Sequence, residues 1–414
     1  MSDFKPITAF QAHAGRTILS WLADPRLRLV GPGEPPPERP DMVVFPAGRT
    51  LDFVHEPPAL PEQVAASLAL GHGVVVFDSA QEAWKHHPLR DQLLHQFAER
   101  LGVPRSRCVY LTQDRGYEAE YARDRRAEGG GRMRILIADH WIRRLLAAHA
   151  EDGETSLGHR RKCFKRRPAE RERRFLSLNL TPRPTKVLFL LSLMRDGLWD
   201  QGFVTFGGFD RMAGLKGRSR EELERGAMEE QGFEDLAETL GPLLPQLDGL
   251  GPVVLGPGSS ELSAADLALD LHLPEYDASW FSVVTETEMR YRPVRITEKT
   301  LKPLLNFHPM LVLGDPGAVA LVRQMGFRTF GDWIDERYDE EPDRRRRFEM
   351  VYQELQRLCA LSEGEMQRME EAAAETLAFN AEWGLVQLPK LHAERLDAAL
   401  TDAILGASKA PFAG

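Results

Sequence analysis

The stretch GVVVFDS (73–79) places four consecutive apolar residues between a glycine and an aspartate. An unbroken apolar run of this length is typical of a strand in a parallel sheet, because helices cover both faces of such a sheet. Similar runs are found at DMVVFPA (41–47), RCVYLTQDR (107–115) and MRILIAD (133–139). Stretches with helical spacing separate them, at 58–71, 87–102 and 140–150. Strands that alternate with helices through short connections indicate a doubly wound α/β sheet.

The same alternation begins again after residue 173. Further strands are expected at RFLSLNL (174–180), GFVTFGG (202–208), WFSVVTE (280–286) and HPMLVLG (308–314). We therefore predict an α/β fold with two Rossmann-like domains facing a cleft and a helical C-terminal extension. The predicted segments are an N-terminal helix and linker (1–40), a first domain (41–155), a basic linker (156–173), a second domain (174–340) and C-terminal helices (341–414).

Composition and charge narrow the class of protein. The 414 residues carry a net charge of −9, which disfavours nucleic acid as a partner. The three cysteines, Cys108, Cys163 and Cys359, lack CxxC spacing and fit a reducing compartment. The N-terminus has no signal pattern, and the longest strongly apolar stretch (187–194) is too short to cross a bilayer. We expect a cytoplasmic protein without a transmembrane segment.

The basic segment from Arg160 to Arg174 holds nine lysines and arginines. One interpretation is a solvated linker or crossover between domains. The other is a surface for an acidic partner or a rim facing phosphate. Phe164 is the one aromatic residue in the segment, whereas a surface for nucleic acid would interleave several for stacking.

RITEKTLKP (295–303) concentrates cations where a helix begins. Thr297 is a suitable N-cap, and the first turn of a helix offers free N–H groups that bind anions. Lys299 in this turn opposes the helix dipole by about 0.3–1 kcal/mol, which a bound phosphate would offset together with Arg295. Glu298, which forms an i,i+4 pair with Lys302, suits ribose or sugar hydroxyls. The alternative is a surface helix with unrelated charges.

Two more groups follow predicted strands. In LNLTPRPTK (178–186), Arg183 and Lys186 lie where a helix begins, at the edge of a sheet where ligands bind; the alternative is a loop with incidental charges. Glu286, in VVTETE with Glu288, ends a strand and suits a donor hydroxyl, the orientation of the lysines or, as an alternative, a divalent cation. Gly314 follows the strand at 308–314, where a backbone without Cβ can approach a ligand.

RITEKTLKPLLNFHPMLVLG (295–314) resembles the C-terminal donor-binding motif of the α-1,3-fucosyltransferases. The chain is more similar still to a family of bacterial and phage proteins described as glycosyltransferases, over most of residues 70–360. The resemblance implies a GT-B arrangement whose C-terminal domain binds a nucleotide-sugar. It implies that Glu298 holds the ribose and that Lys299 and Arg183 contact the diphosphate. Where the fucosyltransferases have an aromatic residue near the base, this chain has Arg295, with Tyr291 as a weak substitute.

The activity implied by the resemblance is transfer of a sugar from a nucleoside-diphosphate-sugar to a glycan, lipid-linked saccharide or protein acceptor. The reaction would be inverting, hexosyl- or fucosyltransferase-like and independent of metal and cofactor, since Arg183, Arg295 and Lys299, supported by Lys302, would neutralise the leaving diphosphate.

An inverting transfer needs a general base, and Asp78 and Asp114 follow predicted strands of the first domain. The expected partners are the nucleotide-sugar donor and a saccharide or glycoprotein acceptor; a homo-oligomer and peripheral association with a membrane stay open. The alternative function is a non-catalytic nucleotide- or saccharide-binding or assembly protein that uses the C-terminal helices, including RRRRFEMVYQELQRL (344–358).

Overall fold

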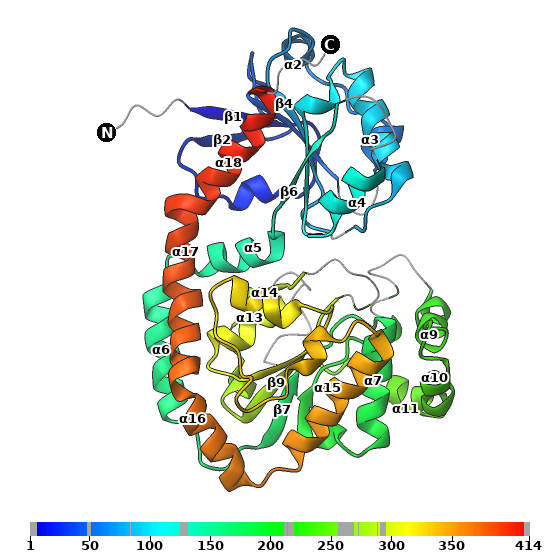
Figure 1. The fold of residues 1–414 in the computed structure, drawn as a ribbon, viewed down its shortest axis with the longest axis vertical. Coiled ribbons are helices and arrows are strands. Elements are labelled where there is room, and N and C mark those ends of the chain that lie inside the picture. Colours follow the sequence, from blue (N-terminus) through cyan, green and yellow to red (C-terminus); the bar gives the residue numbers. More distant parts are fainter. Residues whose placement is uncertain are drawn as a thin grey trace. The chain divides into compact units, whose positions relative to one another are not determined.

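The computed structural model divides the chain into two compact units (Figure 1). Unit 1 comprises Met1–Ala147, Pro293–Arg295 and Leu388–Gly414, and unit 2 comprises Ala148–Arg292 and Ile296–Gln387. The structure describes residues 6–47, 51–82, 84–124, 131–210, 213, 219–255, 269–271, 273–287, 289 and 295–409. Each unit contains a parallel sheet, which confirms the predicted α/β class with two Rossmann-like units and C-terminal helices.

The sheet of unit 1 has six strands in the order β2-β1-β3-β4-β5-β6, and every pairing is parallel. The strands are β1 Ile7–Gln11, β2 Leu27–Val30, β3 Met42–Pro46, β4 Val74–Asp78, β5 Cys108–Thr112 and β6 Arg134–Ile137. The run that predicted the fold is β4, between β3 and β5, and its residues from Val74 to Phe77 are fully buried. Its unbroken apolar sequence follows from this position, because neither face of the strand meets water.

Two separate cores cover the faces of this sheet. One face packs against α1 Asp52–His55, α2 Glu62–Ala69, α3 Pro88–Arg100 and α4 Tyr117–Asp124. The other packs against a 3-10 turn, Ile18–Trp21, and against Leu400 and Ile404 of α18, Asp397–Leu405. Figure 1 shows α18, in red, on the side of the sheet opposite α3. A helix that follows unit 2 in the chain therefore completes the core of unit 1.

The helix predicted near the N-terminus is wrong. Residues 7–11 and 27–30 form β1 and β2, which pair in parallel with each other, and β1 also pairs with β3. Ala9 and Phe10 are buried within the sheet. Pairing with a strand more than thirty residues away outweighs the helical spacing of the apolar residues, because burial on a sheet overrides local preference.

The sheet of unit 2 has four parallel strands in the order β10-β9-β7-β8. They are β7 Arg173–Ser177, β8 Gly202–Val204, β9 Ser279–Thr285 and β10 Met310–Leu313. The helices are α6 Gly153–Lys165, α7 Pro184–Arg195, α9 Arg220–Met228, α10 Glu234–Leu240, α11 Leu244–Gly249, α13 Glu298–Leu305, α14 Ala318–Gln324, α15 Arg344–Cys359 and α16 Glu363–Glu382.

Two helices join the segments already described. They are α5 His140–His149, within which the chain passes from unit 1 to unit 2 after Ala147, and α17 Leu388–Leu391, which precedes α18. The strongly apolar stretch at 187–194 belongs to α7, whose residues from Val187 to Leu191 are fully buried. Among the described residues, no helix is both long and apolar enough to cross a membrane.

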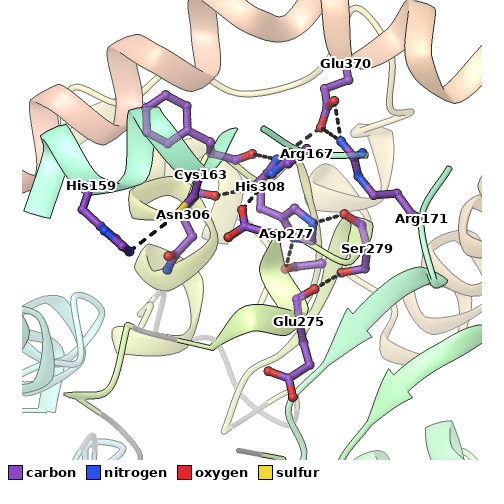
Figure 2. A network of polar contacts seen from close by, with 12 residues as sticks. His159, Cys163, Arg167, Arg171, Glu275, Asp277, Ser279, Asn306, His308 and Glu370 are labelled. Carbon is purple, nitrogen blue, oxygen red and sulfur yellow. Dashed lines mark hydrogen bonds and ion pairs between the residues drawn. The ribbon is translucent and has the colours of Figure 1, made fainter. Parts of the chain in front are cut away.

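Two arginines of the basic segment, Arg167 and Arg171, link separate parts of unit 2, and we call this pair the brace (Figure 2). The first part of the segment is helical up to Lys165, where a linker was predicted. Arg167 Nε donates to Asp277 Oδ1 at 2.9 Å, and Arg171 Nη2 donates to Glu370 Oε2 at 2.8 Å. Both arginine side chains are only 2% exposed. These cations are thus neutralised within the unit, which disfavours their use as an open surface for an acidic partner.

The brace lies at the amino ends of the strands, away from the edge where ligands bind in parallel sheets. His308, directly before β10, is fully buried between Ser279 and Ser282. Its Nδ1 is 2.7 Å from the Ser282 hydroxyl and its Nε2 is 3.0 Å from the Ser279 carbonyl oxygen. Burial places the pKa of His308 well below its ordinary value, so the ring is a neutral structural residue.

Candidate functional site

The strand order of unit 2 reverses direction between β7 and β9. The chain leaves β7 through α7 to reach β8 on one side, and it returns to β9 on the other side. In such sheets the carboxyl ends of the two strands at the reversal form the crevice that binds ligands. The first turns of α7 and α13 follow these strand ends. The residues predicted to bind a donor can therefore be compared with the position that the topology itself favours.

A chain of buried polar side chains joins the carboxyl ends of β7 and β9. Asn179 is 1% exposed, and its Nδ2 donates to Ser177 Oγ at 2.8 Å. The hydroxyl of Thr285 donates to Asn179 Oδ1, and the backbone N–H of Asn179 donates to Thr205 Oγ1 at 2.6 Å. The sequence interpretation missed these residues, although a polar residue directly after a buried strand was a usable signal. Their bonds fix the spacing of the two strand ends.

Glu286 links the end of β9 to the start of α13. It accepts hydrogen bonds from Thr297 N at 2.9 Å, Thr297 Oγ1 at 2.8 Å and Thr300 Oγ1 at 2.6 Å. Burial by itself would raise the pKa of Glu286, but the charge of Lys299 and these hydrogen bonds hold it below its ordinary value. Glu286 is therefore an ionised residue that holds the start of α13, the helix that carries Lys299.

Gly314 lies against Glu286. A Cβ atom at Gly314 would lie 3.2 Å from Glu286 Cβ and 3.3 Å from its Cγ. The carbonyl oxygen of Gly314 accepts a hydrogen bond from Arg347 Nε at 2.9 Å. The glycine thus gives the buried carboxylate its space, whereas the sequence interpretation assigned it to close approach of a ligand.

Lys186 is the most unusual residue at this edge. It lies in the first turn of α7, three residues after the N-cap Arg183, and is 4% exposed. Within the described residues no hydrogen bond or ion pair joins its ammonium group to another side chain. Burial, followed by the charge of Lys299, lowers the pKa of Lys186 to about 7. A lysine in this state changes charge near neutral pH.

The first turn of α13 supplies a second cation and an unused acceptor. Lys299 Nζ donates to Glu298 Oε1 at 2.9 Å and to Thr297 Oγ1 at 3.1 Å, and its side chain is 29% exposed. Glu298 is 5% exposed, and its second oxygen, Oε2, is buried without a hydrogen-bond donor among the described residues. Burial also lowers the pKa of Lys302 to about 8, while the charge of Glu298 opposes that shift.

The structure thus gathers six of the predicted donor-binding residues at one edge of unit 2. They are Lys186, Glu286, Thr297, Glu298, Lys299 and Lys302. Glu288 and Tyr291 lie outside the described residues. Arg295 groups with unit 1, where burial raises the pKa of Asp114 and the charge of Arg295 opposes that rise.

The two candidate general bases, both in unit 1, have different surroundings. Asp78 Oδ2 accepts from Thr17 Oγ1 at 2.5 Å and from Ile18 N at 2.6 Å, while its Oδ1 accepts from Ala80 N at 3.0 Å. Both oxygens of Asp78 therefore accept hydrogen bonds that fix the neighbouring backbone segments. Asp114 accepts from Gly116 N at 2.8 Å, and burial raises its pKa to about 6. Asp114 is the better suited of the two to accept a proton near neutral pH.

Among the described residues, no group of three or more His, Cys, Asp or Glu side chains is arranged to hold a metal ion. Comparisons of the chain with protein-family models, curated proteins and solved structures found no match. The chemistry of the site must therefore be argued from its own residues.

Proposed function

We propose that the protein is a glycosyltransferase that moves a sugar from a nucleoside-diphosphate-sugar to a glycan, lipid-linked saccharide or protein acceptor. One observation carries the proposal. At the carboxyl edge of unit 2, Lys186 is a buried cation without an anionic partner, and Glu298 Oε2 is a buried acceptor without a donor. A ligand that satisfies both carries an anion and a hydroxyl group, and a nucleoside diphosphate carries both.

The cations have a direct use in this reaction. Departure of the nucleoside diphosphate places additional negative charge on its phosphate oxygens. Lys186 and Lys299, with Arg183 at the N-cap of α7, would stabilise that charge from fixed positions, which lowers the barrier to transfer. The N–H groups at the starts of α7 and α13 add to the same effect. Under the proposal Glu298 accepts from a ribose hydroxyl and the reaction is inverting and metal-independent.

For the general base we favour Asp114 over Asp78. With a pKa of about 6, Asp114 is mostly ionised at pH 7 yet basic enough to accept the proton of a hydroxyl as it attacks. Asp114→Asn should abolish transfer while leaving donor binding intact. Loss of donor binding in this variant would contradict the assignment.

The first test is binding followed by turnover. UDP-, GDP-, CMP- and dTDP-sugars are screened by thermal shift, and release of nucleoside diphosphate is then measured with the stabilising donor. Lys299→Ala should remove the shift, whereas Lys165→Ala, at an exposed position at the end of α6, should retain it. No shift with any donor, or an equal shift in both variants, would refute the proposal. A shift without release would favour the non-catalytic binding protein.

The assembly alternative has less support from the C-terminal helices. The arginines at the start of α15 are engaged within unit 2: Arg344 with Glu230 at 2.8 Å, Arg345 with Glu349 at 2.7 Å, and Arg347 with the carbonyl oxygen of Gly314. These arginines are the charges that suggested a surface for a partner, and their contacts within unit 2 leave them less available to bind one.

A further inference from the structure

Lys186 differs from the other buried cations of unit 2 in how it is held. Arg167 and Arg347 are equally buried, but each donates to carboxylate or carbonyl oxygens within the unit. Lys186 has no such acceptor among the described residues, and it occupies the first turn of a 12-residue helix, where the dipole disfavours a cation. A buried lysine in this position therefore suggests that a bound anion supplies the missing partner for its charge.

We propose that anion binding at this edge of unit 2 is coupled to the uptake of one proton by Lys186. In the free protein the Nζ amine is largely neutral above neutral pH. When a phosphate oxygen of the ligand reaches it, the amine takes a proton from solvent and becomes the ammonium group that pairs with the phosphate. The inference rests on the proposed function for the identity of the ligand, a nucleoside diphosphate or its sugar ester.

The charged groups around Lys186 support this coupling. Arg183 precedes it on the same segment and Lys299 faces it from α13, and both disfavour a third positive charge. Glu286 and Glu298 favour one, but each already has a partner. Glu286 accepts from Thr297 and Thr300, and Glu298 accepts from Lys299. Burial, followed by the charge of Lys299, lowers the pKa of Lys186 to about 7, and neither carboxylate forms a hydrogen bond with Lys186 that would oppose this shift.

A bound phosphate reverses that balance. Its negative charge beside Nζ favours the protonated form, so the pKa of Lys186 rises in the complex. Below pH 7 the lysine is already protonated, and the dissociation constant should not change through this group. Above pH 7 the constant should weaken by up to about tenfold per pH unit, because each complex must first gain a proton.

Isothermal titration calorimetry measures the coupling directly. The nucleoside diphosphate that stabilises the protein most, and its sugar ester, are titrated at pH 7.5 in buffers with different enthalpies of ionisation. At this pH about three-quarters of Lys186 is neutral, so uptake of about 0.7 proton is expected, and it should approach zero at pH 6. The sugar ester has no phosphate that titrates near neutral pH, so protons counted with it belong to the protein.

Variants assign the proton to one residue. Lys186→Arg keeps a permanent charge, so binding should persist without proton uptake, and Lys186→Met should bind weakly at every pH. Lys302→Arg is the matched control, because Lys302 is a second buried lysine with a lowered pKa and should not be the main site of uptake.

The outcomes separate the inference from the proposed function. Nucleotide binding without proton uptake in the wild-type protein overturns the inference alone, and this measurement needs no variant to fold. Uptake that persists in Lys186→Met also overturns it. Absence of binding by every nucleoside diphosphate and sugar ester overturns both the inference and the proposed function.

Discussion

Replacing Glu286 by leucine should be among the most damaging single changes in unit 2. Its carboxylate accepts hydrogen bonds from Thr297 N, Thr297 Oγ1 and Thr300 Oγ1 while almost fully buried. Leucine would leave these three donors, and the backbone N–H of Thr287 that also reaches Oε2, without their acceptor, and each buried unpaired donor costs about 1–3 kcal/mol. Since rotation of the hydroxyls recovers part of this cost, we expect a loss of about 3–5 kcal/mol in the free energy of unfolding.

Glu286→Gln separates the hydrogen bonds from the charge. Its remaining oxygen keeps the two bonds made to Oε1, so the loss should be about 1–2 kcal/mol, from the missing charge beside Lys299. The assay is urea unfolding followed by circular dichroism, with amide hydrogen exchange in α13 as the local measurement. Glu375→Gln is the control, because that side chain is 86% exposed and its pair with Arg328 should contribute less than about 0.5 kcal/mol.

Two results would refute this reasoning. If Glu286→Leu costs no more than the control at Glu375, the hydrogen bonds of the buried carboxylate contribute little to stability. If the glutamine and leucine variants cost the same, the charge of Glu286 matters and the hydrogen-bonded oxygens do not.

Three further predictions concern other parts of the chain. Because the pKa of Glu286 is lowered, its contribution to stability is complete above the ordinary glutamate value of 4.5 and is lost as the pH falls through the folded-state pKa; Glu286→Gln should flatten the acid side of a stability–pH curve. Arg167→Ala should lower the free energy of unfolding of unit 2 by about 3–5 kcal/mol in urea unfolding. The control is Arg161→Ala, which should cost less than about 1 kcal/mol because that side chain is 46% exposed. Equal losses would show that the buried contacts of Arg167 do not stabilise unit 2. Ile404→Asp, at a fully buried position of α18, should reduce soluble yield and speed hydrogen exchange in β3 and β4, and unchanged exchange there would show that α18 does not support the sheet.

The strands that could be predicted from the sequence are those that are completely buried. Every residue of the strands β4, β5 and β9 is buried, and these strands are rich in apolar residues because neighbouring strands and helices exclude water from both of their faces. The strands β1 and β2 were missed, since their apolar residues also fit a helical spacing and their assignment depends on partners distant in the chain.

The grouping of the candidate site residues was predictable from the sequence, but their contacts were not. The position of Lys186 and Glu286 after strands follows from the general geometry of parallel sheets. The sequence does not reveal that the carboxylate of Glu286 accepts hydrogen bonds from the start of α13, or that Lys186 has no acceptor among the described residues. Both facts depend on the packing of side chains from three different segments. The same applies to the bond between Asn179 and Thr285.

The position of α18 has a consequence for how the protein is made. The face of the first sheet that α18 covers is apolar, and α18 follows the whole of unit 2 in the chain. While the second unit is translated, the part of this face that α18 covers should be exposed, which favours aggregation of the nascent chain. A stop codon placed between the end of unit 2 and α18 should therefore destabilise the sheet of unit 1 first.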